Sequence, residues 1–474
     1  MASPLKKRHG FSAARSTRTR LASSFTRYWL SFIALSLTLL CSGAAGAQSH
    51  SDYLFTSDVH LNPMDDPKLT DRLAAAPIVQ WDQIFAADRR PYANYLSDTN
   101  AALFQLALAQ MKATVANPQV VFISGDFLAH KYREQWNAAA SDKGDAAFGA
   151  FVDKTIAYIA QEFNAAFPQA QFVITLGNND SPCGDYAAAP HSAFLAHFEQ
   201  AWQPLVDRGG RAPDFAREFI ADGDYVATLP NGTRTISVNS NPWSSSATTA
   251  CDPTNSARGA TIAWLESAVA ASPTGARTWL VEHIPPGIDA YSSFRKQAAV
   301  QFYLPELLAR FRAVRSHDGT PLGLIIAAHL HNDGFRIVDK SPLLLVPSIS
   351  PVHANNPSFF VAHVDATSGI IADYDAYALD LPAAIAGSAN PPAFAHEYAF
   401  DTAYAVQGYT LASLAKLQQS IHDDTQHIRE TEADHYVSGS RFLAITAQTW
   451  LTFWCSNANP DAASFESCLN QPAH

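Results

Sequence analysis

Five short apolar segments of this chain are each followed at once by side chains that can bind a metal ion. In chain order, these side chains are Asp58 and His60, Asp126, Asn178, His283, and His329 and His331. Oxygen and imidazole donors without thiolates suit zinc, manganese or iron. A pair of metal ions needs a carboxylate that bridges them and roughly three further donors per ion. The pattern therefore predicts a centre for two divalent cations.

The segment before Asp126 indicates how these side chains are positioned. Residues 121–123 form a short, mostly β-branched apolar run, which leads into Gly125 and Asp126 and then His130. Such a run is typical of a strand buried on both faces. The polar residues after it project from the carboxyl end of the strand, where α/β proteins place their chemistry. A single histidine is common by chance, but five strand ends with such residues predict one shared site.

Apolar periodicity predicts alternating strands and helices around these five points. The expected strands span about 52–57, 121–126, 170–176, 233–240, 278–282 and 322–328. The expected helices span about 101–115, capped by 98–100, and 146–167, 259–271 and 297–311. Three further strands, near 334–338, 343–347 and 358–364, suggest a meander that completes a second sheet. We therefore predict an α/β fold, a two-sheet αββα sandwich with helices outside.

The two ends of the chain differ from this central region. Residues 1–47 combine seven Lys and Arg with an apolar run at 28–40 and small residues at 45–47, which predicts a signal peptide cut before Gln48. An uncleaved membrane anchor is the alternative. From about residue 381, helical patterns at 410–421 and 441–454 predict a helical C-terminal subdomain, 381–474, after a main domain, 48–380. Its apolar positions are expected to pack onto the main domain rather than to face a membrane.

Charge and cysteine content limit the function. Loss of the seven basic residues changes the formal net charge from −11 to −18, which argues against binding of a nucleic-acid duplex. Anionic substrates would then need local positive charge, which bound metal ions supply. Four cysteines remain, and an even number in an exported chain predicts two disulfides. Proximity in sequence favours Cys455 with Cys468, which leaves Cys183 with Cys251; free buried thiols are the alternative.

Taken together, these motifs resemble the calcineurin-like metallophosphoesterase superfamily over about residues 52–365. More narrowly, they are similar to the acid sphingomyelinase-like phosphodiesterases. The similarity rests on the order of the strand-end residues and on three longer motifs: Gly125-Asp126-x-x-x-His130, His283-Ile284-Pro285-Pro286-Gly287 and His329-Leu330-His331-Asn332-Asp333.

The resemblance implies a division of roles. Asp58, His60, Asp126 and His331 would hold one metal ion, and Asp126, Asn178, His283 and His329 the other. Asp126 is then the bridge, and a hydroxide between the ions would attack phosphorus. His130 would contact the scissile phosphate and help to protonate the leaving group, a task that suits imidazole near neutral pH.

One departure from the family pattern bears on the chemistry. The family commonly has Gly-Asn-His where this chain has Gly177-Asn178-Asn179. Asn179 can donate a hydrogen bond to a phosphoryl oxygen but cannot transfer a proton. The expected catalytic residues are therefore His130 and Asn179, with His130 as the acid.

The resulting expectation is a secreted or periplasmic phosphodiesterase with two divalent metal ions, zinc before manganese or iron. Its substrate would be a small phosphoester, a nucleotide, polyphosphate or a phospholipid head group, without a stable membrane anchor once the signal peptide is cut. A polyphosphatase or nucleotide phosphohydrolase is the alternative within enzymes. A non-catalytic metal-binding surface protein is the alternative of another class, and turnover of any phosphoester would exclude it.

Overall fold

The computed structural model of the protein describes residues 50–471, apart from 89, 188, 317, 389 and 390. The predicted signal peptide, residues 1–47, lies outside the described residues. The two predicted disulfides are both present, Cys183 with Cys251 and Cys455 with Cys468. In the part of the chain that is described, no helix has the length and apolar character needed to cross a membrane.

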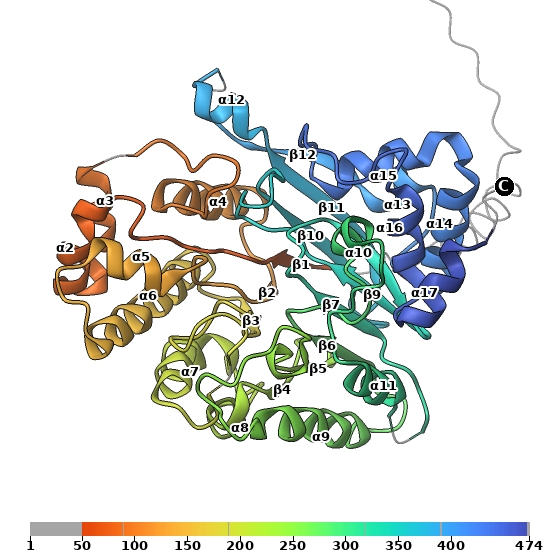
Figure 1. The fold of residues 1–474 in the computed structure, drawn as a ribbon, viewed down its shortest axis with the longest axis horizontal. Coiled ribbons are helices and arrows are strands. Elements are labelled where there is room, and N and C mark those ends of the chain that lie inside the picture. Colours follow the sequence, from red (N-terminus) through yellow and green to blue (C-terminus); the bar gives the residue numbers. More distant parts are fainter. Residues whose placement is uncertain (1–49, 89, 188, 317, 389–390, 472–474) are drawn as a thin grey trace, which may run out of the picture. The chain divides into compact units, whose positions relative to one another are not determined.

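Two six-stranded sheets form the centre of the fold (Figure 1). The first sheet runs, in spatial order, β12 (Phe394–Ala399), β11 (Ile371–Leu379), β10 (Ser358–Asp365), β1 (His50–Thr56), β2 (Val120–Ile123) and β3 (Gln171–Ile174). The second runs β4 (Tyr225–Thr228), β5 (Arg234–Ser237), β6 (Thr278–Val281), β7 (Leu324–Ala327), β9 (Ser341–Leu345) and β8 (Gly334–Val338). Strands β1, β2 and β3 are mutually parallel, as are β5, β6, β7 and β9.

Side-chain alternation along the strands explains the layers. Successive residues of a strand point to opposite faces. Tyr53 and Phe55 of β1 lie in the core between the two sheets, where Tyr53 is 6.2 Å from the ring of Trp279 in β6. Leu54, between them in sequence, belongs to the core on the outer face of the first sheet. The central strands are therefore buried on both sides, and the predicted αββα sandwich is confirmed.

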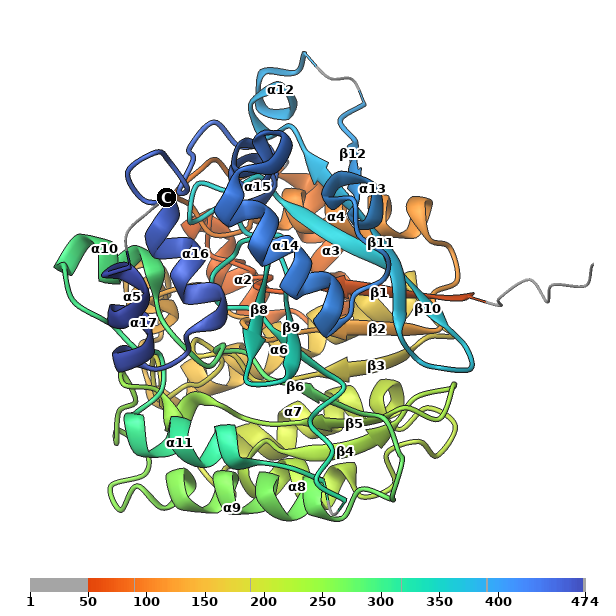
Figure 2. The ribbon, with the colours of Figure 1, turned by 90° about the vertical axis from the view of Figure 1, so that its right-hand side faces the viewer.

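Helices cover both outer faces (Figure 2). On the first sheet these are α4 (Ala101–Thr114), α6 (Asp145–Ala166) and α7 (Ala193–Val206), and on the second α9 (Ser256–Ala270) and α11 (Pro305–Ala313). Shorter helices include α2 (Thr70–Ala75), α3 (Trp81–Ala87), α5 (Tyr132–Ala139), α8 (Phe215–Asp222), α10 (Ala290–Lys296) and α12 (Leu381–Ala386). Towards the C-terminus follow α13 (Phe400–Tyr404), α14 (Leu411–Asp423), α15 (Ile428–Tyr436), α16 (Trp450–Ala458) and α17 (Ala462–Leu469).

Two of the predicted helices begin later than expected. The helix predicted from 297 begins at Pro305, because a proline lacks the N–H of a helix interior and suits the first helical turn. The helix predicted from 441 begins at Trp450. The Thr449 hydroxyl accepts a hydrogen bond from the N–H of Thr446 and donates to the carbonyl oxygen of Ala444, and such local bonds compete with the helix.

The predicted meander of three strands was wrong. β8 and β9 pair within the second sheet, but β10 crosses to the first sheet and runs antiparallel to β1. An apolar run fully buried on both faces fits the centre of either sheet, so its sequence does not select one. The segment after 380 also contributes a strand, β12, at the edge of the first sheet. The domain boundary at 380 stays a prediction.

Candidate metal centre

The seven predicted ligands lie together at one edge of the two sheets. Asp58 and His60 follow β1, Asp126 follows β2 and Asn178 follows β3, while His283 follows β6 and the two remaining histidines follow β7. The carboxyl ends of parallel strands meet at the same edge. Burial is nearly complete, since Asp58, His60 and His283 have no exposed surface and Asp126 only 1%. The structure therefore brings these residues together at the edge where the strands end.

Asp126 lies between histidines that come from different sheets. Its Oδ2 atom is 3.3 Å from Nε2 of His60 and 3.2 Å from Nε2 of His283. Asp126 belongs to two groups whose ligand atoms all lie within 4.8 Å of one another, one with Asp58 and His60 and one with His283 and His329. A carboxylate common to two adjoining ligand groups is the geometry that a bridging residue requires.

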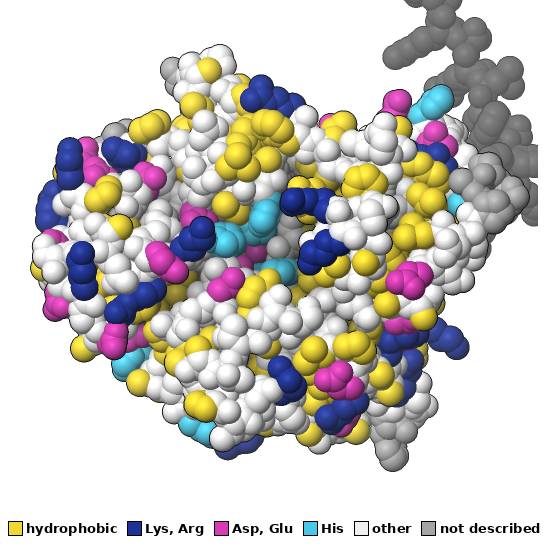
Figure 3. All heavy atoms as spheres, in the orientation of Figure 1, with side chains coloured by type: hydrophobic (Ala, Val, Ile, Leu, Met, Phe, Trp, Pro, Cys, Tyr) yellow, Lys and Arg dark blue, Asp and Glu magenta, His cyan; other side chains and the backbone are white. Residues whose placement is uncertain are grey.

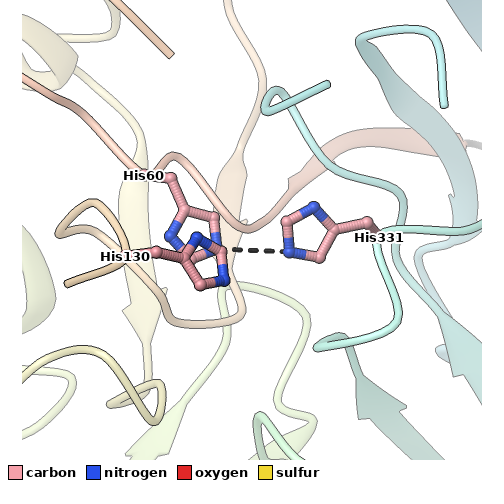
Figure 4. A group of neighbouring side chains, drawn as sticks. All are labelled: His60, His130 and His331. Atoms are coloured by element: carbon pink, nitrogen blue, oxygen red, sulfur yellow. Dashed lines mark hydrogen bonds between the residues drawn. The ribbon is translucent and has the colours of Figure 1, made fainter. Parts of the chain in front are cut away.

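Each of the two groups has a further predicted ligand beside it. On one side, Nε2 of His331 lies 3.2 Å from Nε2 of His60 and 3.3 Å from Oδ1 of Asp58 (Figure 4). On the other side, Oδ1 of Asn178 lies 3.0 Å from Nε2 of His283. The arrangement brings together the two ligand sets implied by the family resemblance.

Hydrogen bonds at the far ring nitrogens orient three of the histidines. Nδ1 of His60 is 2.8 Å from the carbonyl oxygen of Leu128, and Nδ1 of His283 is 2.6 Å from that of Ser124. Nδ1 of His331 is 3.1 Å from the Ser348 hydroxyl. Carbonyl oxygens only accept hydrogen bonds, so the first two Nδ1 atoms carry the proton. Their Nε2 atoms then face the centre, as in metal-binding histidines generally.

Several buried side-chain atoms have no hydrogen-bond partner among the described residues, and one of them, Oδ1 of Asp58, lies at the centre. Ser57 donates its hydroxyl hydrogen to Oδ2 of Asp58, whereas Oδ1 of Asp58 is buried and accepts no hydrogen bond among the described residues. A buried carboxylate oxygen left in this way is costly. A divalent cation would satisfy it, and the surrounding oxygen and imidazole donors are those that such cations accept. The residues present therefore fit a metal centre.

The backbone at the site adopts conformations that are rare for residues other than glycine. Five of the predicted ligands have a positive φ angle: Asp58 (45°), His60 (42°), Asp126 (55°), His329 (71°) and His331 (62°). Such left-handed conformations are costly and cluster at functional sites. Gly125 (φ 89°) is required for a second reason, because a Cβ there would lie 2.7 Å from the backbone nitrogen of Gly177. The strand ends are thus shaped to aim side chains inward.

Burial keeps most of the imidazoles neutral. It lowers the pKa of His60 to about 4, with help from the charge of His130. It also lowers the pKa values of His329 and His331 well below the usual value. Burial acts in the same direction on His283, but the carboxylate of Asp126 outweighs it and raises that pKa to about 9. Neutral imidazole is the form that binds metal ions, and a bound cation displaces a proton such as that on His283.

His130 stands beside the centre with its own carboxylate partner. Its ring stacks on His60 at a centroid distance of 4.2 Å (Figure 4), and its Nδ1 is 2.8 Å from Oδ1 of Asp98. Burial lowers the pKa of His130, but the hydrogen bond and charge of Asp98 outweigh it, so the pKa is raised. Among the described residues, Nε2 of His130 has no hydrogen-bond partner. The ring centre of His353 lies 4.4 Å from that of His331.

Asn179 is directed at the shared carboxylate. Its backbone N–H donates to Oδ1 of Asp126 (2.8 Å), and its side-chain amide donates to Oδ2 (2.9 Å). The predicted hydrogen bond from Asn179 to a phosphoryl oxygen stays a prediction. What the structure adds is a positioning contact, which fixes Asp126 from the loop after β3.

Sequence reasoning missed three aspartates that support the ligands. Asp98 was interpreted as part of a helix cap, whereas Asn100 makes the capping bond and Asp98 holds His130. Asp180 accepts hydrogen bonds from the backbone after β2 and after β3 and so ties the two ligand loops together. Oδ1 of Asp185 accepts from the Asn178 amide (2.6 Å). Only Asp180 had a sequence signal, its place directly after the Gly-Asn-Asn motif.

The centre opens into a cavity of about 690 Å³. Figure 3 shows histidine side chains in a hollow of the surface, with basic side chains beside it. One wall carries Asp126, His130, Asn178, His329 and His331, and the opposite wall is formed by α15, α16 and the segment between them. A ligand can therefore reach the metal-binding atoms from solvent.

Comparison with known proteins indicates the same family as the sequence motifs. The calcineurin-like phosphoesterase family model matches residues 52–333. A protein from Dictyostelium discoideum named sphingomyelinase phosphodiesterase D is 24% identical over 375 residues, which cover 74% of this chain and 77% of that protein. Human acid sphingomyelinase-like phosphodiesterase 3b is 24% identical over 438 residues, which cover 87% of this chain and 89% of that protein.

A solved structure from Staphylococcus aureus, provisionally described as a 5′-nucleotidase, matches with a TM-score of 0.32 and 9% identity. The match covers 78% of this chain and 58% of that one, less than two thirds of its length. The family model, in contrast, spans more than half of the chain and all five strand ends that carry the buried aspartate and histidine cluster. The chain therefore belongs to the calcineurin-like phosphoesterase family and is a metal-dependent phosphoesterase.

Proposed function

We propose that the chain is an exported phosphodiesterase with a dinuclear metal centre. Asp58, His60, Asp126 and His331 would hold one ion, and Asp126, Asn178, His283 and His329 the other. The observation that carries the proposal is the place of Asp126 in two adjoining ligand groups, each completed by buried or half-buried side chains. Zinc is the ion best suited to this set of donors, with manganese or iron as alternatives.

Two bound cations would activate a water molecule for attack on phosphorus and offset the charge of the phosphoryl oxygens. His130 has the position of a general acid. Asp98 holds its Nδ1–H, so its Nε2–H can pass a proton to the leaving oxygen as the phosphorus–oxygen bond breaks. Asn179 holds Asp126 in place through both of its amide groups.

Two further features support the wider assignment. Disulfides persist mainly in oxidising compartments, and the two in this chain support export and the signal-peptide prediction. The cavity beside the centre accommodates a group much larger than phosphate, which supports a diester substrate. Both relatives carry phosphodiesterase in their names.

Replacement of the shared ligand tests the mechanism. Asp126→Asn keeps the size of the side chain but removes its charge, so hydrolysis of bis(p-nitrophenyl) phosphate is expected to fall below detection while the thermal unfolding transition remains cooperative. Asp423→Asn, which changes an exposed carboxylate on α14, should retain the parental rate. Undiminished turnover by Asp126→Asn would exclude a mechanism that depends on the shared carboxylate.

A substrate panel tests the substrate class. We expect phosphodiesters with a bulky apolar or aromatic group to be hydrolysed faster than polyphosphate or nucleoside monophosphates, because the cavity extends well beyond the metal centre. Preferential release of phosphate from polyphosphate or nucleotides would contradict the proposed diester specificity and favour a phosphohydrolase. No turnover of any phosphoester by the metal-loaded protein would favour a metal-binding protein without catalysis.

A further inference from the structure

Four exposed hydrophobic side chains surround the opening of the metal-site cavity. Among the described residues, six large hydrophobic side chains are well exposed, and four of them line this cavity: Leu96 (75% exposed), Tyr291 (57%), Phe442 (45%) and Leu443 (48%). They come from three segments that are far apart in the sequence. Single exposed hydrophobic residues are ordinary, but a group at one opening marks an interaction surface. We call these four residues the rim.

Neighbouring contacts hold the rim in place. The ring of Tyr95 packs edge-on against Phe442 at 5.2 Å, and the Tyr95 hydroxyl donates to Oδ1 of Asn356 at 2.6 Å. Leu96 has a φ of 65°, and its N–H donates to the carbonyl oxygen of Pro351 at 3.1 Å. Glycine or asparagine would adopt this conformation at lower cost. An exposed leucine at a position that disfavours it indicates that the side chain has a function there.

Arginines accompany the two aromatic residues of the rim. The guanidinium carbon of Arg441 lies 4.8 Å from the ring centre of Phe442, and that of Arg295 lies 5.5 Å from the ring centre of Tyr291. Both arginines are exposed, and neither forms an ion pair with a carboxylate within the described part of the chain. The chain as a whole has a formal net charge of −11. These two arginine side chains therefore make the rim an exception to its overall negative charge.

We infer that the rim is a docking surface for an anionic lipid bilayer. Aromatic and leucine side chains enter the boundary between head groups and acyl chains, while arginine side chains reach the anionic phosphates. The arginines of the rim complement such a surface, whereas in a symmetric dimer the rim of one chain would face the rim of the other and bring like charges together. Docking in this way turns the cavity opening, and the metal ligands behind it, towards the lipid. The expectation that C-terminal apolar residues pack inward holds for Phe453 but not for Phe442 and Leu443.

Sedimentation with vesicles tests the inference on the full chain. The protein is expected to pellet with phosphatidylcholine vesicles that contain phosphatidylserine and to pellet less with pure phosphatidylcholine. The double variant Phe442→Ser, Leu443→Ser should bind at least about tenfold more weakly, because two apolar side chains no longer enter the lipid. Arg295→Gln with Arg441→Gln should weaken binding to the anionic vesicles roughly 30-fold, because two cations near the lipid phosphates are lost.

Matched controls distinguish binding through the rim from binding through any exposed hydrophobic side chain. Val79 and Ile385 are the other two exposed large hydrophobic residues, and they lie away from the cavity. Val79→Ser with Ile385→Ser should bind vesicles as the parent does. Leu96→Gly should bind more weakly without loss of thermal stability, because glycine suits the positive φ angle. Equal binding by the parent and all rim variants would overturn the inference, as would absence of binding by the parent.

Two other outcomes are informative. If the parent forms dimers that the Phe442 and Leu443 changes abolish, without any vesicle binding, the rim contacts a second copy of the chain and the lipid inference is wrong. Asp126→Asn should bind vesicles as the parent does, because binding does not require turnover. Failure of the lipid inference is thereby distinguished from failure of the proposed catalytic function.

Discussion

Asp126 is placed by contacts that reach it from three directions. Asn179 donates two hydrogen bonds to its carboxylate, His60 approaches from the first sheet and His283 from the second. Burial disfavours the charge of Asp126, but His283 and His60 outweigh it and lower the pKa of the carboxyl below its usual value. Asp126 is therefore ionised and oriented by the protein alone.

The role of His130 as an acid leads to a prediction that depends on the leaving group. His130→Ala should slow hydrolysis of a diester with an alkyl leaving group about 10²–10⁴-fold, because an alkoxide needs a proton. The rate of hydrolysis of a p-nitrophenyl ester should fall much less, since p-nitrophenolate leaves without a proton. The measurement is kcat/KM for the two substrates, compared with His197→Ala, which removes an exposed histidine also paired with an aspartate.

The geometry also allows a competing role for His130, because its ring nitrogen lies in a possible ligand group with His60 and His331. Equal loss on both substrates, together with loss of bound metal from His130→Ala, would show a ligand in place of an acid.

Asp185 is expected to act through Asn178. Its carboxylate holds the Asn178 amide so that the amide oxygen faces His283. Without it, the amide is free to turn, so Asp185→Ala should lower the affinity for one metal ion by about 10–100-fold, as is typical for such supporting contacts. Asp185→Asn keeps an oxygen acceptor and should retain most of the affinity. Titration of metal into the metal-free protein measures both, and equal affinities for the parent and Asp185→Ala would exclude the role.

At the scale of elements, the ligand-bearing strands were predictable because each is a short apolar run with a polar end. Asp98 and Asp185 were not, since their partners lie 32 and 7 residues away along loops that no periodicity describes. Helix starts depended on local features such as Pro305, which the apolar pattern alone did not resolve. The placement of β10 in the first sheet depended on long-range pairing with β1, which a strand's own sequence does not encode.

The position of β10 also creates a pH-sensitive link across the first sheet. His363 of β10 has its Nδ1 2.9 Å from Asp52 of β1 and its Nε2 3.0 Å from Asp375 of β11. Burial lowers the pKa of His363, but the two carboxylates outweigh it, so the pKa is raised. A group whose pKa is raised in the folded state makes its full contribution to stability below its unfolded-state pKa, which is about 6.5 for histidine. This contribution is lost as the pH rises through the folded-state pKa.

His363→Gln should therefore lower the free energy of unfolding more at about pH 5 than at about pH 9. Urea unfolding at both pH values measures the difference, with His197→Gln as a control for loss of a surface histidine. A cost of His363→Gln that is the same at both pH values, or larger at the higher one, would contradict this assignment.

At the scale of the whole molecule, the site exists because two sheets pack face to face with their functional ends at the same edge. Each sheet supplies part of the ligand set, so neither would form the centre alone. The order of the strand-end motifs along the sequence predicted this arrangement. The sequence did not predict the cavity wall made by α15 and α16, nor the exposed rim. The exposure of Phe442 and Leu443 depends on where the C-terminal helices pack.

The most direct test of the central claim is the metal content of the parent and of Asp126→Asn, measured by mass spectrometry after equilibration with zinc and removal of free ions. The parent is expected to retain about two ions per chain, and Asp126→Asn to lose both, since each ion shares that carboxylate. Asp423→Asn should match the parent. Retention of both ions by Asp126→Asn would contradict a centre built on one shared residue, and so would a fully active parent that holds no metal.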